Sequence, residues 1–144
     1  MSESNVDVRS VIACDDVRVE ATGKSIFIGI YDADIAVSAF PIQLNLSFVI
    51  IANVKKAANI KLNTRILGPS GDPLGESEIS FDVLQDHLGI MLPPHRLTNV
   101  FSSAGYLTFQ AQVAGEWKDV ARWRVEKGAV LLEEAAKLGI TKPF

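Results

Sequence analysis

Apolar and polar residues alternate with a period of two along most of this chain. In residues 43–54, QLNLSFVIIANV, every even-numbered residue is apolar, and the odd-numbered set includes the polar residues Gln43, Asn45, Ser47 and Asn53. Successive side chains of a β-strand point to opposite faces of a sheet, so this period indicates strands with one buried face. A helical period would spread the polar residues over the apolar stripe. The alternation therefore predicts a protein built from strands.

Clusters of turn-forming residues join these strands into hairpins. GPSGDPLG, AGEW and TGK each lie between two alternating runs. Glycine permits positive φ and proline fixes φ, which is why such clusters mark turns. The side chains that we expect to face the core include Ile26, Ile28 and Ile30 in the first hairpin, Ile60, Leu62 and Ile66 in the second, and Leu107, Phe109, Trp123 and Val125 in the last.

The remaining segments are shorter or less regular. LGIML, before the double proline Pro93–Pro94, predicts a short edge strand, because proline cannot donate to a central ladder. AVLLEEAAKLGI predicts a C-terminal helix that ends near Gly139. Together the patterns predict an immunoglobulin-like antiparallel β-sandwich of seven or eight strands with a short C-terminal helix, and a jelly roll is the alternative. We expect a polar tail at 1–7, the sandwich at 8–127, and the helix and tail at 128–144.

Composition argues against several classes of function. The chain has 144 residues and a formal net charge of −3, and no run of Lys or Arg exceeds two, so we expect no nucleic-acid partner. The longest apolar run, FVIIA, is too short to span a bilayer, and the polar start MSESNVDVRS lacks the features of a secretory signal. We therefore expect a cytoplasmic protein without membrane contact; a mature secreted form that has lost its signal is the alternative.

The acidic pair of CDD interrupts the first alternating run. Strict alternation would turn Asp15 toward the core together with Ala13 and Val17, and an unpaired buried carboxylate costs several kcal/mol. A bulge or strand break at Asp15–Asp16 would turn both carboxylates outward. The alternative is a divalent-cation site, because carboxylates gathered at one end of a sandwich can hold calcium. Its candidate ligands are Asp15, Asp16, Asp32 and Asp34, although we expect no metal or other cofactor.

No combination of residues predicts catalysis. Cys14 would need a base to form a thiolate, and a lone cysteine among apolar residues is usually a small buried hydrophobe. His87 and His95 lie in the irregular segment DHLGIMLPPH, with a spacing that matches no familiar metal site, so we expect surface-loop histidines. GPSGDPLG lacks the Lys and Ser/Thr of a phosphate loop. The chain is therefore expected not to be an enzyme.

Two features point instead to binding. Apolar residues occupy positions that alternation places on an outer face: Phe27, Tyr31, Val49, Ile51 and Leu67. Exposed apolar patches often mark contacts, so either the C-terminal helix covers this face or a protein partner or a second copy does. Trp117, in the AGEW turn, is the candidate for a ligand platform. A non-enzymatic protein-interaction or structural module, open to self-association, is therefore the leading hypothesis. The alternative is a small-ligand or carbohydrate-binding sandwich, with or without the assistance of calcium.

Several stretches resemble a family of small bacterial proteins of unknown function. They are CDDVRVEATGKSIFIGIY, FPIQLNLSFVIIANV, RILGPSGDPLG and AGYLTFQAQVAGEW, which together span most of Cys14 to Val125. The resemblance implies a β-sandwich and assigns no catalytic residue. GYLTFQ is also similar to the penultimate strand of immunoglobulin-like sandwiches, but this chain lacks their cysteine pair, so the similarity concerns architecture alone.

Overall fold

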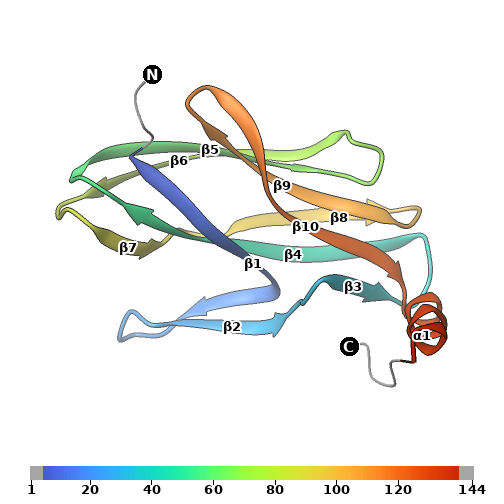
Figure 1. Cartoon of the computed structure of the whole chain (residues 1–144). Helices are drawn as coiled ribbons and strands as arrows, with labels where there is room; N and C mark the ends of the chain where they lie inside the picture. The colour runs from blue at the N-terminus through green and yellow to red at the C-terminus, as the bar shows by residue number, and fades with distance from the viewer. Residues whose placement is uncertain (1–4, 140–144) are drawn as a thin grey trace.

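Two sheets pack face to face in the computed structural model, which describes residues 5–139 (Figure 1). Within this range the chain forms ten strands and one helix. Their bounds are β1 (Val6–Val19), β2 (Ser25–Ile30), β3 (Asp34–Val37), β4 (Ile42–Val54), β5 (Ala58–Leu67), β6 (Pro73–Val83), β7 (Leu88–Met91), β8 (His95–Phe101), β9 (Gly105–Val113), β10 (Glu116–Lys127) and α1 (Gly128–Lys137).

The two sheets contain five strands each. In sheet A the order is β2-β1-β4, and both β7 and β8 pair with the free side of β4; in sheet B the order is β3-β10-β9-β5-β6. All pairs are antiparallel except β3 with β10. The all-β sandwich with a short C-terminal helix is confirmed. The immunoglobulin-like strand order and its jelly-roll alternative stay predictions.

The expected number of strands is wrong, because the sequence hides β3 and β8. Strand β3 has only four residues, too few to display a period, and its only partner in the sheet is the parallel strand β10. Strand β8 follows the double proline and begins with a histidine, so its sequence is typical of a loop. The predicted hairpins β1–β2, β5–β6 and β9–β10 are confirmed by their registers.

The core lies between the sheets and is centred on three aromatic rings. Phe48 of β4 contacts Phe109 of β9 and Trp123 of β10, with ring centroids 5.7 and 5.2 Å apart. The even-numbered residues of β4 from Leu46 to Val54 are buried, as the alternation predicts. Burial of such rings stabilises a domain by several kcal/mol each, so this cluster joins the two sheets.

Strand β1 belongs to two ladders in succession. Its first part, from Val6 to Cys14, pairs with β4, and from Cys14 onward it pairs with β2. The register shift lies between Val8 and Ser10. Before it the even-numbered residues Val6 and Val8 face the core, and after it the odd-numbered residues Val11 and Ala13 do. The predicted bulge or break at Asp15–Asp16 is therefore wrong, since β1 runs unbroken to Val19. The carboxylates avoid the core because β1 has left β4 by that point.

Helix α1 packs at one end of sheet B, beside β3 and β10 (Figure 1). Leu131 and Ala135 are its buried residues, and Gly139 follows its C-terminus with φ +78°, as predicted for a C-terminal cap. No helix among residues 5–139 is long and apolar enough to cross a membrane. Strand β1 begins inside the expected polar tail, whose residues 1–4 lie outside the described range, as do residues 140–144.

Candidate protein-interaction surface

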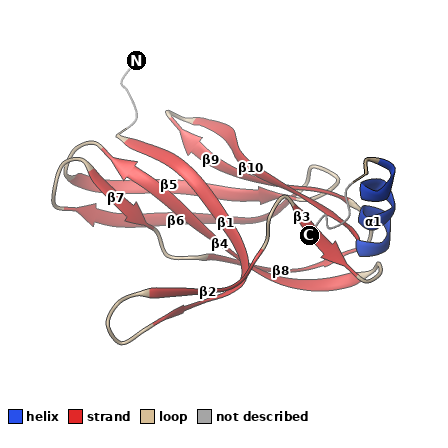
Figure 2. Ribbon diagram, turned by 60° about the horizontal axis from the view of Figure 1, so that its bottom comes forward, coloured by secondary structure: helices blue, strands red, loops and turns tan. Residues whose placement is uncertain are grey.

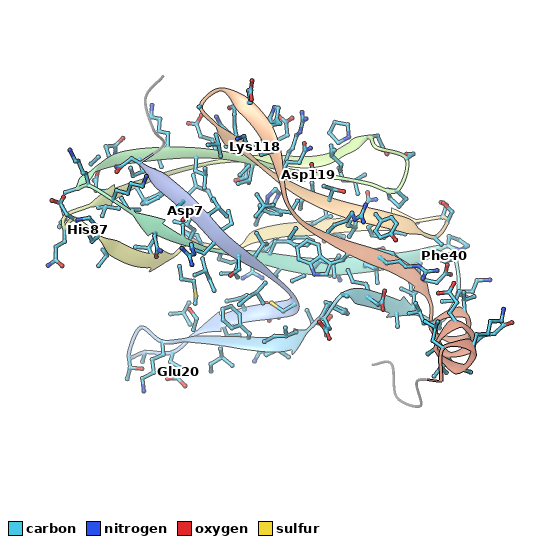
Figure 3. The ribbon with its side chains drawn as sticks, viewed as in Figure 1. Asp7, Glu20, Phe40, His87, Lys118 and Asp119 are labelled. Atoms are coloured by element: carbon cyan, nitrogen blue, oxygen red, sulfur yellow. The ribbon has the colours of Figure 1, made fainter. Side chains whose placement is uncertain are left out.

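The last part of β1 and the whole of β2 form a hairpin arm, defined as residues 15–30. Figure 2 shows this arm projecting from the sandwich, and Figure 3 shows Glu20 at its turn, far from the other labelled residues. The turn is closed by two backbone bonds, from Gly23 N–H to Glu20 O and from Glu20 N–H to Lys24 O. Gly23 has φ +88°, a conformation that favours glycine. The local sequence thus fixes the hairpin, and its position depends on its contacts with sheet A.

The underside of the arm covers an apolar patch on the outer face of sheet A. Val17 and Phe27 pack against Cys14 and Val49, and Val49 is only 1% exposed. The expectation that Val49 lies on an open outer face is therefore wrong. The helix does not provide the cover, because it lies beside β3 and β10. The arm itself covers this face.

The other expected members of the outer apolar face do not form one surface. Ile51 is half-buried on β4 of sheet A, and Leu67 is half-buried at the end of β5 in sheet B. Because the two side chains belong to different sheets, the expected stripe is divided between them. On the arm, by contrast, several apolar side chains are exposed.

Arg96 of β8 attaches the arm to the sheet. Its guanidinium donates to Asp16 Oδ1 at 3.0 Å and to the carbonyl oxygen of Val17 at 3.3 Å. A third bond, at 3.4 Å, reaches Ser47 Oγ of β4. The bond from Arg96 holds the pKa of Asp16 below its usual value, with further contributions from the Val17 N–H and Arg18. Asp16 therefore stays ionised and acts as an attachment point.

Asp15 has a different partner, which directly follows β2. It accepts a hydrogen bond of 2.5 Å from the Tyr31 hydroxyl, and its carboxyl group lies against Gly29, where a Cβ atom would sit. Burial raises the pKa of Tyr31 to about 12, helped by the bond to Asp15, so the hydroxyl stays protonated and donates. Tyr31 also packs against the main core. This contact holds the base of the arm.

The upper face of β2 carries three exposed apolar side chains. Ile26, Ile28 and Ile30 are 42%, 40% and 61% exposed, with Arg18 and Asp16 of β1 opposite Ile26 and Ile28. Val19, 71% exposed, lies on the other face of the hairpin, the one that also carries Val17 and Phe27. The prediction that the three isoleucines face the core is wrong. Phe27, whose side chain points to the opposite face of β2, is the one that packs against sheet A. The sequence does carry a signal for this: SIFIGI has apolar residues on both parities, so alternation alone cannot tell which face is covered.

An apolar groove of about 530 Å³ runs between the arm and the segment that joins β7 to β8. Its lining includes Val19 from the arm, Met91 from β7 and the double proline. Met91 also lines a second groove, of about 490 Å³, between β6 and β7, where Leu84 is 87% exposed. The two grooves share Met91, Leu92 and Pro93. Apolar surface therefore continues from the arm to the far edge of sheet A.

The four candidate metal ligands do not converge. Asp15 and Asp16 are bonded to Tyr31 and Arg96, whereas Asp34 begins β3 and is paired in register with a residue of β10 in sheet B. Among residues 5–139 no group of three or more His, Cys, Asp or Glu side chains could hold a metal ion. The local geometry assigns Asp15 and Asp16 to structural contacts.

The candidate nucleophile and bases lie apart from one another. The Cys14 thiol is 0% exposed, and its sulfur lies 3.4 Å from Asp16 O and 3.7 Å from Ser47 O. Burial raises its pKa, as does the charge of Asp15, which disfavours the thiolate. His87 is exposed in the turn before β7 with φ +54°.

His95 is buried between the sheets, so its expected place in a surface loop is wrong. Its Nδ1 lies 3.3 Å from Thr64 Oγ1 of β5, and its ring meets Phe109 edge-on at 6.1 Å. Burial lowers the pKa of His95, which favours the neutral ring.

Trp117 lies on the outer face of sheet B, within a row of polar contacts. The Arg65 guanidinium stacks over its ring, 4.3 Å from the centroid, and also donates to Gln110 Oε1 at 2.6 Å. Gln110 in turn donates to Asp119 at 2.7 Å. Another arginine, Arg122 of β10, stacks over the ring of Tyr106, 4.1 Å from its centroid. One face of each of these two rings is thus occupied by an arginine of the chain itself.

A third groove, of about 490 Å³, lies at the seam between β1 and β10. Asp7, Lys118 and Asp119, labelled in Figure 3, line it together with Arg9. Asp7 accepts a bond of 3.4 Å from Arg9, and the charges along the groove are mixed. Such a lining offers a ligand no concentration of one charge, in contrast to the continuous apolar surface at the arm.

No protein-family model matches the chain, and no curated protein sequence matches it at a significant level. The resemblance to small bacterial proteins therefore stays a prediction. The geometry of the arm is the main indication of what the protein does.

Proposed function

We propose that this protein is a non-enzymatic protein-interaction module that contacts its partner through the β1–β2 arm. The observation that carries the proposal is the exposure of the three isoleucines of β2 on one face of a projecting hairpin. Contiguous apolar patches on folded domains mark contact sites, and apolar anchors supply most of the binding energy of an interface. The free, buried cysteine is compatible with the reducing cytoplasm, where we propose that the module acts.

A projecting hairpin suits this role for a mechanical reason. The contacts of Arg96, Tyr31 and Phe27 hold the arm against sheet A, so its upper face is presented in a fixed orientation. Binding by a rigid element loses little conformational entropy, which favours affinity. The arm thus has both an anchored underside and an apolar contact face.

Photo-crosslinking in the producing cell tests the proposal. A photoreactive residue at Ile28 should yield discrete covalent adducts on irradiation, because that side chain lies in the proposed interface. The control places the same residue at Ser80, an exposed position of β6 on the opposite sheet. Equal labelling at both positions, or adducts at neither, would contradict the proposal.

A further inference from the structure

We propose that the partner at the arm is a second copy of this chain, which adds its own β2 antiparallel to this one; the inference rests on the proposed function. The two copies would form a continuous four-stranded sheet, β1-β2-β2-β1, across a two-fold axis at Ile28. Such an arrangement is isologous, so each contact occurs twice.

Strand β2 is an open sheet edge. Among residues 5–139 it pairs with β1 alone, and Figure 1 shows it along the border of the arm away from β4. An edge strand presents unpaired backbone N–H and C=O groups to which another strand can bond. Addition of a strand would satisfy these groups and place the isoleucines of the two copies side by side on one face.

The other edges carry charges, adjoin prolines or are short, and β2 has none of these three features. Strand β6 carries Glu76, Glu78 and Asp82, β3 has only four residues and begins with Asp34, and β7 has four residues and ends just before the double proline. Strand β8, which pairs with β4 at the same side as β7, is also an edge and carries Arg96. Charges, proline and short length are the usual protections of an edge strand. The six residues of β2, SIFIGI, contain no charge and no proline. Among the described edge strands, β2 is therefore the one best suited to pairing by its charge, proline content and length.

The charges that flank β2 select the register. Lys24 precedes the strand and Asp32 follows it, and both are exposed. With Ile28 opposite its own copy, Ile26 opposes Ile30 and Lys24 opposes Asp32 of the second copy. Opposite charges and apolar pairs across strands are both stabilising. A parallel in-register pairing would instead set Lys24 against Lys24 and Asp32 against Asp32, which is repulsive.

These two charges cannot pair within one copy. They lie eight positions apart, at opposite ends of β2, and fully extended chain of that length spans about 26 Å. Within residues 5–139 neither side chain has an ion-pair partner. The second copy supplies a partner to each, twice per dimer, so the sequence KSIFIGIYD is complementary to its own reverse.

The size of the contact sets its strength. A six-residue strand pair is a small interface, and interfaces below about 1,200 Å² are typically weak and transient. We therefore expect a monomer–dimer equilibrium that depends on concentration and weakens with salt, because the flanking ion pairs are exposed.

Sedimentation velocity over a wide range of protein concentration measures this equilibrium. The wild-type chain should shift from monomer to dimer, and Ile28→Lys should weaken association by about tenfold or more, because it places two lysines at the two-fold axis. The matched control is Val100→Lys, which changes an aliphatic side chain of similar exposure (57%) on β8 and should leave association unchanged. Circular dichroism establishes that both variants are folded.

Charge reversal tests the register itself. Lys24→Asp and Asp32→Lys should each weaken self-association, because each homodimer then sets like charges opposite one another. An equimolar mixture of the two variants should restore dimers, since every opposed pair in the mixed dimer is again of opposite sign. A mixture that stays monomeric, or a wild-type chain that is monomeric throughout, overturns the inference. If the Ile28 crosslink then captures only a different protein, the proposed function stands while this inference fails; if it captures nothing, both fail.

Discussion

Gly29 shows how one residue fixes the geometry of the arm. It adopts φ +67°, which L-residues with a side chain rarely do, and the Asp15 carboxyl group fills the space of its missing Cβ. The same carboxyl group accepts the Tyr31 bond. A single glycine therefore permits the acidic residue to lie across β2 and tie the two strands together.

Gly29→Ala should destabilise the protein more than Gly23→Ala. Both positions have positive φ, so both variants lose about 1 kcal/mol in backbone conformation. At Gly23 nothing lies within 4 Å of the added Cβ, whereas at Gly29 the methyl group displaces Asp15 and weakens its bond to Tyr31, which costs about 1 kcal/mol more. Urea denaturation monitored by tryptophan fluorescence measures the difference. Equal losses in the two variants would contradict this role of Asp15.

At the scale of elements, the arm and sheet A enclose one thiol. Cys14 lies on the outer face of the sheet and is buried in a cluster to which the arm contributes Val17 and Phe27. The arm is held there in part by Arg96, whose partners Asp16 and Val17 both belong to the arm. The reactivity of Cys14 therefore reports whether the arm is docked.

Arg96→Gln should increase the rate at which iodoacetamide alkylates Cys14 in the native protein. The variant loses the charged bonds to Asp16 and the Val17 carbonyl, so the arm opens more often, and labelling should accelerate several-fold because reaction requires local opening. The wild-type thiol should be protected until unfolding.

Arg122→Gln is the matched control, because Arg122 lies on β10 of the other sheet and stacks on Tyr106. Mass spectrometry at timed intervals gives the rates. Identical rates for wild type and Arg96→Gln would show that Arg96 does not retain the arm.

In the molecule as a whole, His95 couples the packing of the two sheets to pH. The ring lies between β8 and β5 beside Thr64, and burial holds its pKa below the ordinary value of 6.5. The unfolded chain therefore binds a proton at a higher pH than the folded chain does. The sandwich is most stable with His95 neutral, above the unfolded pKa, and this stabilisation is lost as the pH falls through the folded pKa.

The free energy of unfolding should accordingly decrease between pH 7.5 and pH 5.5, about a unit on either side of the histidine's ordinary pKa. His95→Gln should flatten this dependence, whereas His87→Gln, at an exposed position, should retain it. Urea titrations at several pH values supply the measurement. Asp16 and Glu134, whose pKa values are lowered by Arg96 and Arg124, lose their charges only in more acidic solution. A slope in His95→Gln equal to that of the wild type would refute the assignment.

Much of the fold could be predicted because alternation is local. The runs around Phe48, Phe109 and Trp123 show which parity is apolar, and those side chains do meet in the core. Glycine-rich turns located three hairpins for the same reason. By contrast, β3 and β8 depend on pairing with β10 and β4, which are distant in sequence, so no local period showed them.

Local sequence is sufficient to specify the alternating strands, the hairpins and the short terminal helix, since each depends on neighbouring residues. The covered side of the first hairpin, by contrast, depends on how distant segments pack. SIFIGI is apolar at both odd and even positions, so the choice depends on residues distant in sequence. Val49 packs with Phe27, and Arg96 bonds to Asp16 and Val17, so Phe27 lies inward and Ile28 is exposed. The candidate interface depends on which side of the hairpin packs on sheet A, because only the side that the rest of the fold leaves exposed can bind a partner.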